Sequence, residues 1–287
     1  MPNMFVAFAT LCFNLSGIKW FGVIMDWIML ILNLDSLLKL ALGGVIGFCL
    51  GMTGVGGGVL IIPILQVVFG MGTVLAVGTA SLISALVKVG AGISHISAGN
   101  VAWRPVAFML LGAVPSTLLI TELILRINSD EAHSVMLHQV IDWMIIGVML
   151  FSLLSLYLGK RKNSEAIASD IKKRKAVCTG AGCGAVLGST GVGGGVMLLP
   201  AFNSFLGVDI KKSIGSSVVM ALALSSITAL NYSKGGQADW TTAGLMTFGA
   251  LLGVPLAVRI VKKIEEKYLY TLTLGVILFA LALTLLF

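Results

Sequence analysis

An eleven-residue segment occurs twice in this chain of 287 residues, with the second copy 137 positions after the first. The copies span residues 53–63 and 190–200, and eight of their eleven residues are identical. The match continues beyond the segment without a gap, so that Trp103 falls on Trp240. A duplicated glycine cluster in an apolar chain predicts two equivalent units whose helices are interrupted at the same place.

The composition indicates that most of the chain lies in lipid. Hydrophobic residues make up 57% of the sequence and charged residues only 11%, whereas a soluble domain carries about 25% charged residues. The net charge of +7 does not point to nucleic acid, because seven of the nineteen basic residues lie between positions 160 and 175. Such a cluster between apolar spans is typical of a cytoplasmic membrane loop.

Apolar stretches long enough to cross a bilayer recur along the chain, each close to the ~20 residues that ~30 Å of hydrocarbon requires. They cover residues 77–98, 104–126, 138–158, 214–235, 241–260 and 267–287. The N-terminal region, residues 1–39, predicts one further span near residues 20–38.

The two segments that hold the repeats have an unusual length. Residues 40–70 and 177–206 are too long for one crossing and too short for two. If both are re-entrant hairpins, 13 of the 19 basic residues lie on the side of the basic loop. This distribution follows the positive-inside rule. If residues 177–206 crossed the membrane instead, several of these basic residues would lie outside.

The sequence therefore predicts an all-α polytopic membrane protein of two inverted repeats. Each repeat is a glycine-broken re-entrant helical hairpin followed by three transmembrane helices. The repeats cover residues 40–158 and 177–287 and are joined by the basic loop, residues 159–176. In this arrangement the protein lies in the cytoplasmic membrane, with the loop inside and the C-terminus outside.

The glycine clusters are the first candidate substrate site. Glycines allow close backbone approach, and the N–H groups that open a half-helix attract anions. A threonine precedes each cluster, where an N-cap hydroxyl is expected. The alternative is that the glycines only allow close helix packing. The candidates are Thr53, Gly54, Gly56, Gly57, Gly58, Thr190, Gly191, Gly193, Gly194 and Gly195. No Lys-Ser or Lys-Thr follows, so a nucleotide-binding loop is not indicated.

Lys88 is the second candidate, because it lies at the centre of an expected span. A charge at that depth is costly and faces a cavity or a partner. Ser84 and His95 share its helical face. The alternatives are that Lys88 forms a structural ion pair with a buried carboxylate or is mostly neutral. Thr79, Ser216 and Ser217, which follow matching glycines, are further candidate contacts. Glu122 and Arg126 predict an ion pair at the outer end of a helix.

The duplicated Gly-x-x-Gly-x-Gly-Gly-Gly core, its following proline, and the Gly-x-x-x-Trp elements at Gly99 and Gly236 resemble the TauE/SafE family of membrane transporters. The resemblance covers residues 40–287. It implies a sulfur-containing anion as substrate, sulfite or an organosulfonate such as sulfoacetate. Nothing in the residues themselves names sulfur.

These observations predict a secondary transporter that moves a small anion by alternating access around a midplane site. No enzyme activity, cofactor, metal site, nucleotide or nucleic-acid partner is expected, and a homo-oligomer is compatible with the sequence. The alternatives are a passive anion channel, a redox protein using the four cysteines, and a non-transporting subunit of a larger complex.

Overall fold

A computed structural model describes residues 34–53, 58–159, 173–191, 197–261 and 266–286, and every element in these ranges is a helix. In chain order they are α3 (Leu34–Thr53), α4 (Gly58–Val67), α5 (Thr73–Ser97), α6 (Trp103–Asn128), α7 (Glu131–Gly159), α8 (Lys173–Thr190), α9 (Leu198–Pro200), the π-helix η1 (Ala201–Phe205), α10 (Ile210–Lys234), α11 (Trp240–Val261) and α12 (Glu266–Leu286). The all-helical prediction is confirmed for this part of the chain. The span expected near residues 20–38 lies mostly outside it.

Six of these helices are long and apolar enough to cross a membrane. The spans are 34–52, 73–97, 103–128, 133–154, 211–234 and 240–257, and a shorter apolar stretch covers Thr271–Leu285. Large apolar side chains such as Leu119 and Leu252 are exposed on the outside of the bundle, as lipid contact requires. The expected helices are therefore present, with some boundaries shifted by several residues.

Two helices begin earlier than expected. α3 starts at Leu34 rather than residue 40, and α8 starts at Lys173 rather than residue 177. In α3 the first turn is stabilised by an ion pair between Asp35 and Lys39, 2.7 Å apart, at (i, i+4) spacing. Backbone hydrogen bonding thus continues past the apolar stretch into residues that reach water.

The helices repeat at the offset seen in the sequence. α5 covers residues 73–97 and α10 covers 210–234, so both ends differ by 137. α6 and α11 begin at Trp103 and Trp240, and the glycines before them, Gly99 and Gly236, both have positive φ. Those two tryptophans are exposed at helix starts, where interface anchors are expected.

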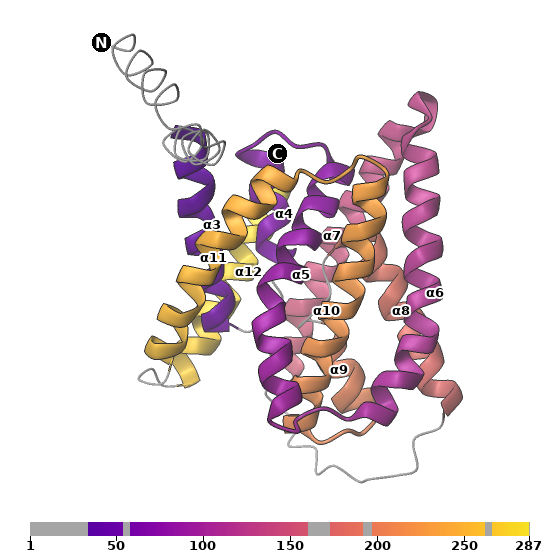
Figure 1. The fold of residues 1–287 in the computed structure, drawn as a ribbon, viewed down its shortest axis with the longest axis vertical. Coiled ribbons are helices and arrows are strands. Elements are labelled where there is room, and N and C mark those ends of the chain that lie inside the picture. Colours follow the sequence, from indigo (N-terminus) through magenta and orange to yellow (C-terminus); the bar gives the residue numbers. More distant parts are fainter. Residues whose placement is uncertain (1–33, 54–57, 160–172, 192–196, 262–265, 287) are drawn as a thin grey trace, which may run out of the picture.

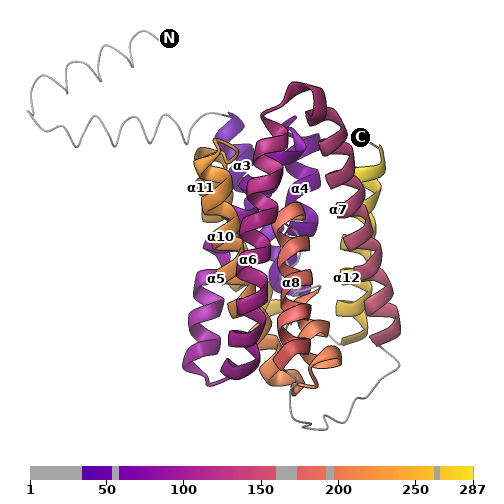
Figure 2. The same cartoon turned by 90° about the vertical axis from the view of Figure 1, so that its right-hand side faces the viewer.

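The two halves of the chain are interlocked rather than side by side. α3 packs along α11, and α8 packs along α6 (Figures 1 and 2). Glycines make both contacts close: a Cβ atom at Gly43 would lie 2.2 Å from the Met246 carbonyl oxygen, and one at Gly180 would lie 2.1 Å from that of Met109. Glycine therefore serves close helix packing along α3 and α8.

α5 and α10 form the centre of the molecule (Figure 1). They run antiparallel, because a Cβ atom at Gly78 near the start of α5 would lie 1.8 Å from the Gln237 carbonyl oxygen, just beyond the end of α10. In the equivalent contact, a Cβ atom at Gly215 would lie 2.0 Å from the Asn100 carbonyl oxygen. Equivalent helices of the two halves thus make the same contact in opposite directions.

Each broken segment starts and ends at the same end of the bundle. Lys39 Nζ at the start of α3 lies 5.5 Å from the centre of the Phe69 ring, just after α4. In the second half, Ala176 of α8 and Leu206 after η1 belong to one buried cluster. Both segments therefore fold back on themselves.

Candidate functional site

Described helices lie on both sides of each glycine cluster. α3 ends at Thr53 and α4 begins at Gly58; α8 ends at Thr190 and α9 begins at Leu198. Gly54, Gly56 and Gly57 in the first cluster, and Gly193, Gly194 and Gly195 in the second, lie outside the described residues. Their role as backbone donors to an anion stays a prediction.

The N-cap assignment for the two threonines is wrong. Thr190 is the last residue of α8, and its buried hydroxyl donates to the Val186 carbonyl oxygen at 2.6 Å. Gly191 follows with φ of 62°, and its N–H donates to the Leu187 carbonyl oxygen at 2.8 Å. This is a glycine C-cap, which ends a helix in the left-handed conformation that glycine adopts without strain. Thr53 likewise ends α3.

Lys88 is buried in α5, with a relative exposure of 8%. Its ammonium group donates a hydrogen bond to the hydroxyl of Ser84, which is also buried. The three ion pairs found among the described residues do not include Lys88, so no carboxylate in that part of the chain neutralises it. The structural ion pair considered from the sequence is not present there.

Lys88 lies at the crossing of the two central helices. Gly78 contacts Gln237, and Gly215 contacts Asn100. Residue 89 of α5 is midway between Gly78 and Asn100, and residue 226 of α10 is midway between Gly215 and Gln237. Lys88 is one residue from that point, and its equivalent in α10 is the buried Ser225. The positive charge therefore lies where the two halves meet, with no positive counterpart on the other side.

His95 is less closely connected to this centre. It lies seven residues beyond Lys88, about 10 Å along the helix axis, and is half-buried in the last turn of α5. The structure therefore places His95 at the end of the helix and not beside the Lys88 ammonium group.

Thr79 and Ser216 have structural partners in the opposite half. Thr79 Oγ1 accepts a hydrogen bond from the Asp239 backbone N–H at 3.0 Å. Ser216 Oγ accepts one from the Ala102 backbone N–H at 2.9 Å. The two bonds are related by the offset of 137, and each holds the residue immediately before a long helix of the other half. Ser217 donates to the Ile214 carbonyl oxygen of its own helix.

The Asp239 carboxylate in turn caps α11. It accepts hydrogen bonds from the Thr241 and Thr242 backbone N–H groups and from the Thr242 hydroxyl. Burial raises the pKa of Asp239, but the hydrogen bonds from Thr242 and Thr241 outweigh it and hold the pKa below its ordinary value. Asp239 thus caps α11 with its carboxylate and is bonded to Thr79 through its backbone N–H.

We expect Thr79→Val and Ser216→Ala each to lower the free energy of unfolding by about 1 kcal/mol, because each leaves a backbone N–H without its acceptor. Ser226→Ala is the matched control, since the Ser226 hydroxyl donates only to the Leu222 carbonyl oxygen of its own helix. Thermal unfolding of the purified variants in one detergent measures the effect. If Ser226→Ala lowers the free energy of unfolding as much as the two variants do, the hydrogen bonds of Thr79 and Ser216 stabilise the protein no more than a bond within one helix.

Ser81 is a polar residue inside an expected span, but it is not among the site residues predicted from the sequence. Its side chain is fully buried, at 0% exposure, and its hydroxyl has no hydrogen-bond partner in the described part of the chain. A Cβ atom at Gly191 would lie 3.0 Å from Ser81 Oγ, so this hydroxyl lies against the end of α8. Its spacing of three and seven residues from Ser84 and Lys88 was the available signal.

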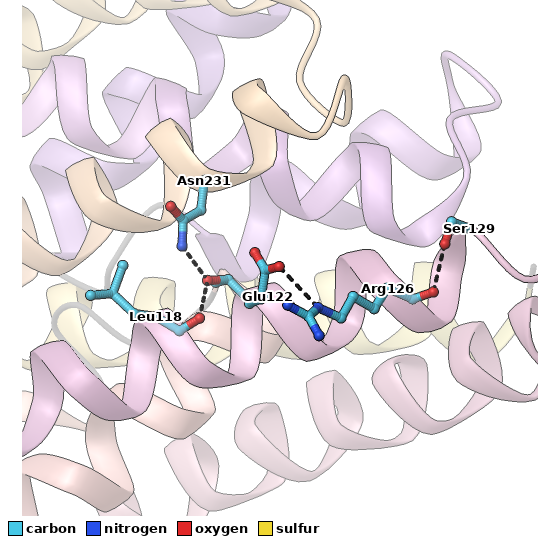
Figure 3. Close-up of polar contacts among 6 residues, drawn as sticks. Leu118, Glu122, Arg126, Ser129 and Asn231 are labelled. Carbon is cyan, nitrogen blue, oxygen red and sulfur yellow. Dashed lines mark hydrogen bonds and ion pairs between the residues drawn. The ribbon is translucent and has the colours of Figure 1, made fainter.

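Two open cavities lie near helix ends away from this centre. One of about 310 Å³ is lined by Glu122, Arg126 and Asn231. The Arg126 guanidinium donates to the Glu122 carboxylate at 3.0 Å, as expected from the sequence, and Asn231 donates to the Thr121 hydroxyl (Figure 3). The exposed ion pair contributes little stability.

The second cavity, of about 410 Å³, is lined by Asp142 and Thr73 among others. The Asp142 carboxylate accepts hydrogen bonds from the hydroxyl of Thr73 and the amide of Gln66. This network ties α7 to α4 and α5 where the first broken segment ends.

Metal and thiol chemistry find little support in the described residues. No group of three or more His, Cys, Asp or Glu side chains there is placed to hold a metal ion. None of Cys49, Cys178 and Cys183 is disulfide-bonded to another described cysteine.

Comparison with known proteins identifies the family. The family model described as "Sulfite exporter TauE/SafE" matches residues 38–285. A "Probable membrane transporter protein" of Xylella fastidiosa (strain 9a5c) is 27% identical over 248 residues, covering 84% of this chain and 91% of its own length. The "Probable membrane transporter protein YjnA" of Bacillus subtilis (strain 168) is 20% identical over 241 residues, covering 83% and 94%.

No solved structure shows significant similarity to this chain. The family model, however, covers both broken segments and the Lys88 centre between them. The chain belongs to the sulfite exporter TauE/SafE family of membrane transporters.

Proposed function

We propose that this protein is a secondary transporter that moves a small sulfur-containing anion, sulfite or an organosulfonate such as sulfoacetate, across the cytoplasmic membrane. The observation that carries the proposal is the buried Lys88 ammonium group, which no described carboxylate neutralises. A buried cation of this kind needs a negative partner, and a bound anion supplies one. The family description supports sulfur chemistry for that anion.

The pseudosymmetric packing supports transport by alternating access. Residues 40–158 and 177–287 act as inverted repeats in this proposal, and the antiparallel contact of α5 with α10 supports the inversion. Two halves that make the same contacts in opposite directions can exchange roles, opening the centre first to one face and then to the other. Lys88, near the crossing point, stays at the centre of both arrangements.

The proposed orientation places residues 160–175, 211–213 and 259–267 in the cytoplasm, and residues 127–137 and Phe287 outside. We expect a single cysteine at position 212, in a cysteine-free background, to be labelled by an impermeant thiol reagent only after the membrane is opened. A cysteine at position 133 is the outward-facing control, because His133 is exposed in the structure. Labelling of position 212 in intact cells would contradict the orientation.

The direct test is binding and transport by the purified protein. We expect sulfite or an organosulfonate to bind more tightly than chloride, measured by calorimetry across sulfite, sulfate, thiosulfate and sulfoacetate. In proteoliposomes, uptake of the bound anion should saturate and be accelerated by the same anion loaded inside. Saturation with counterflow supports a transporter, whereas flux that rises linearly without counterflow would support a passive channel instead.

A further inference from the structure

We propose that the Ser81 hydroxyl is a direct ligand of the transported anion, which binds beside Gly191 between Ser81 and the Lys88 ammonium group. This inference rests on the proposed function. It locates the anion on one side of the pseudosymmetric centre, against the end of α8.

The first observation is that the Ser81 hydroxyl is buried without a partner. Several serine hydroxyls in these helices donate to the carbonyl oxygen four residues earlier, as Ser94, Ser189 and Ser226 do. Ser81 makes no such bond, and no other described atom accepts from it. A buried hydroxyl left without a hydrogen bond destabilises the protein, so a ligand that accepts from it accounts for its place.

The second observation is the distance between the donors. The Lys88 side chain leans toward the start of α5, as helical side chains do, and its ammonium group reaches Ser84. Ser84 is three residues from Ser81, or about 4.5 Å along the helix axis. One oxyanion with a hydrogen bond of about 2.8 Å to each donor can bridge that gap.

The end of α8 does not repel an anion as strongly as a bare helix C-terminus would. The Val186, Leu187 and Gly188 carbonyl oxygens already accept hydrogen bonds from Thr190, Gly191 and Tyr232 respectively. These three donors satisfy carbonyl groups that otherwise carry the negative end of the helix dipole. A Cβ atom at Gly191 would lie 3.0 Å from Ser81 Oγ and 3.1 Å from the Val77 carbonyl oxygen, so glycine at this position lets the end of α8 approach Ser81 closely.

The third observation is that the equivalent face of α10 lacks these donors. The offset of 137 places Val218, Ala221 and Ser225 where α5 has Ser81, Ser84 and Lys88. Only α5 therefore presents two hydroxyls and a cation on one face. The position of the proposed anion site is therefore set by side chains that differ between α5 and α10, although the backbone around it is nearly symmetric.

Ser81→Ala tests this assignment with sulfite and sulfoacetate as the probes, under oxygen-free conditions. We expect the variant to bind about 10- to 100-fold more weakly, as the loss of a hydrogen bond to a charged group predicts. Its Tm without ligand should be unchanged or higher, because the variant loses a hydroxyl that has no partner among the described residues. Thr247→Val is the matched control, since Thr247 is a second buried hydroxyl without a described partner, on α11; we expect its affinity to be unchanged.

The outcomes separate this inference from the proposed function. Anion binding that is equal in Ser81→Ala and the unmodified protein would overturn the role of Ser81 and leave the transporter proposal standing. A lower Tm in Ser81→Ala would overturn it too, because the hydroxyl would then have a structural partner. If the unmodified protein binds neither probe, the proposed substrate class fails, and the inference fails with it.

Discussion

Lys88→Met should weaken anion binding by about 2–4 kcal/mol, roughly 30- to 1000-fold, because it removes the buried charge that an anion at the centre of α5 would face. The methionine keeps the length of the side chain and its apolar packing. Folding should be unaffected or slightly favoured, since a buried unpaired ammonium group is costly. Calorimetric titration with sulfite and thermal unfolding of the same samples measure the two effects separately.

Two further variants make the Lys88 result specific. Lys88→Arg keeps the charge with a different shape, so we expect it to retain partial binding. Lys211→Met removes an exposed charge from the first turn of α10 and should leave affinity unchanged. The assignment would be wrong if Lys88→Met binds and transports like the unmodified protein. Loss of binding only through unfolding would instead point to a structural role.

The second large effect concerns the close contacts that hold the central helices together. Gly78→Ala and Gly215→Ala place a Cβ atom 1.8 Å from the Gln237 carbonyl oxygen and 2.0 Å from that of Asn100. Backbone cannot yield as easily as a side chain, so α5 and α10 must separate from the turns that they contact. We expect each variant to lose about 3 kcal/mol of unfolding free energy, the upper part of the range for overpacked cores.

Gly90→Ala and Gly244→Ala are the matched controls. Nothing lies within 4 Å of the Cβ atom that either substitution adds. Alanine is favoured over glycine in a helix by about 1 kcal/mol, so the Tm of both controls should stay the same or rise. Because the Gly78 and Gly215 contacts are equivalent, their losses should be similar. A large loss of unfolding free energy at one position and none at the other would show that the two contacts contribute unequally to stability.

The sequence by itself determined the helices and their breaks. Long apolar stretches predict spans because lipid offers the backbone no hydrogen-bond partners, and the observed α5, α6, α10 and α11 agree with them. The repeated glycines predicted the end of α8 at Thr190 and Gly191, since glycine disfavours a continuous helix. The depth of Lys88 within its span also predicted that it is buried, as it is.

Only the tertiary structure decided what the hydroxyl groups do. Thr79 and Ser216 were candidate ligand contacts, but each accepts a hydrogen bond from the backbone of the other half. Thr190 was expected at a helix start and lies at a helix end. A hydroxyl in a helix can bond its own backbone, a neighbouring helix or a ligand, and sequence does not distinguish these choices.

The pairing of the helices was also beyond the sequence. The offset of 137 relates equivalent residues but does not say which helices of the two halves touch. α3 packs on α11 and α8 packs on α6 because glycines along these helices let the backbones approach closely. The sequence alone does not show which of the glycine-lined helices pair with one another. The same packing leaves Ser81 buried with no hydrogen-bond partner among the described residues, while it supplies partners for Thr79 and Ser216. Which polar group stays available is set by the final fit of the helices, and that fit is a property of the whole fold.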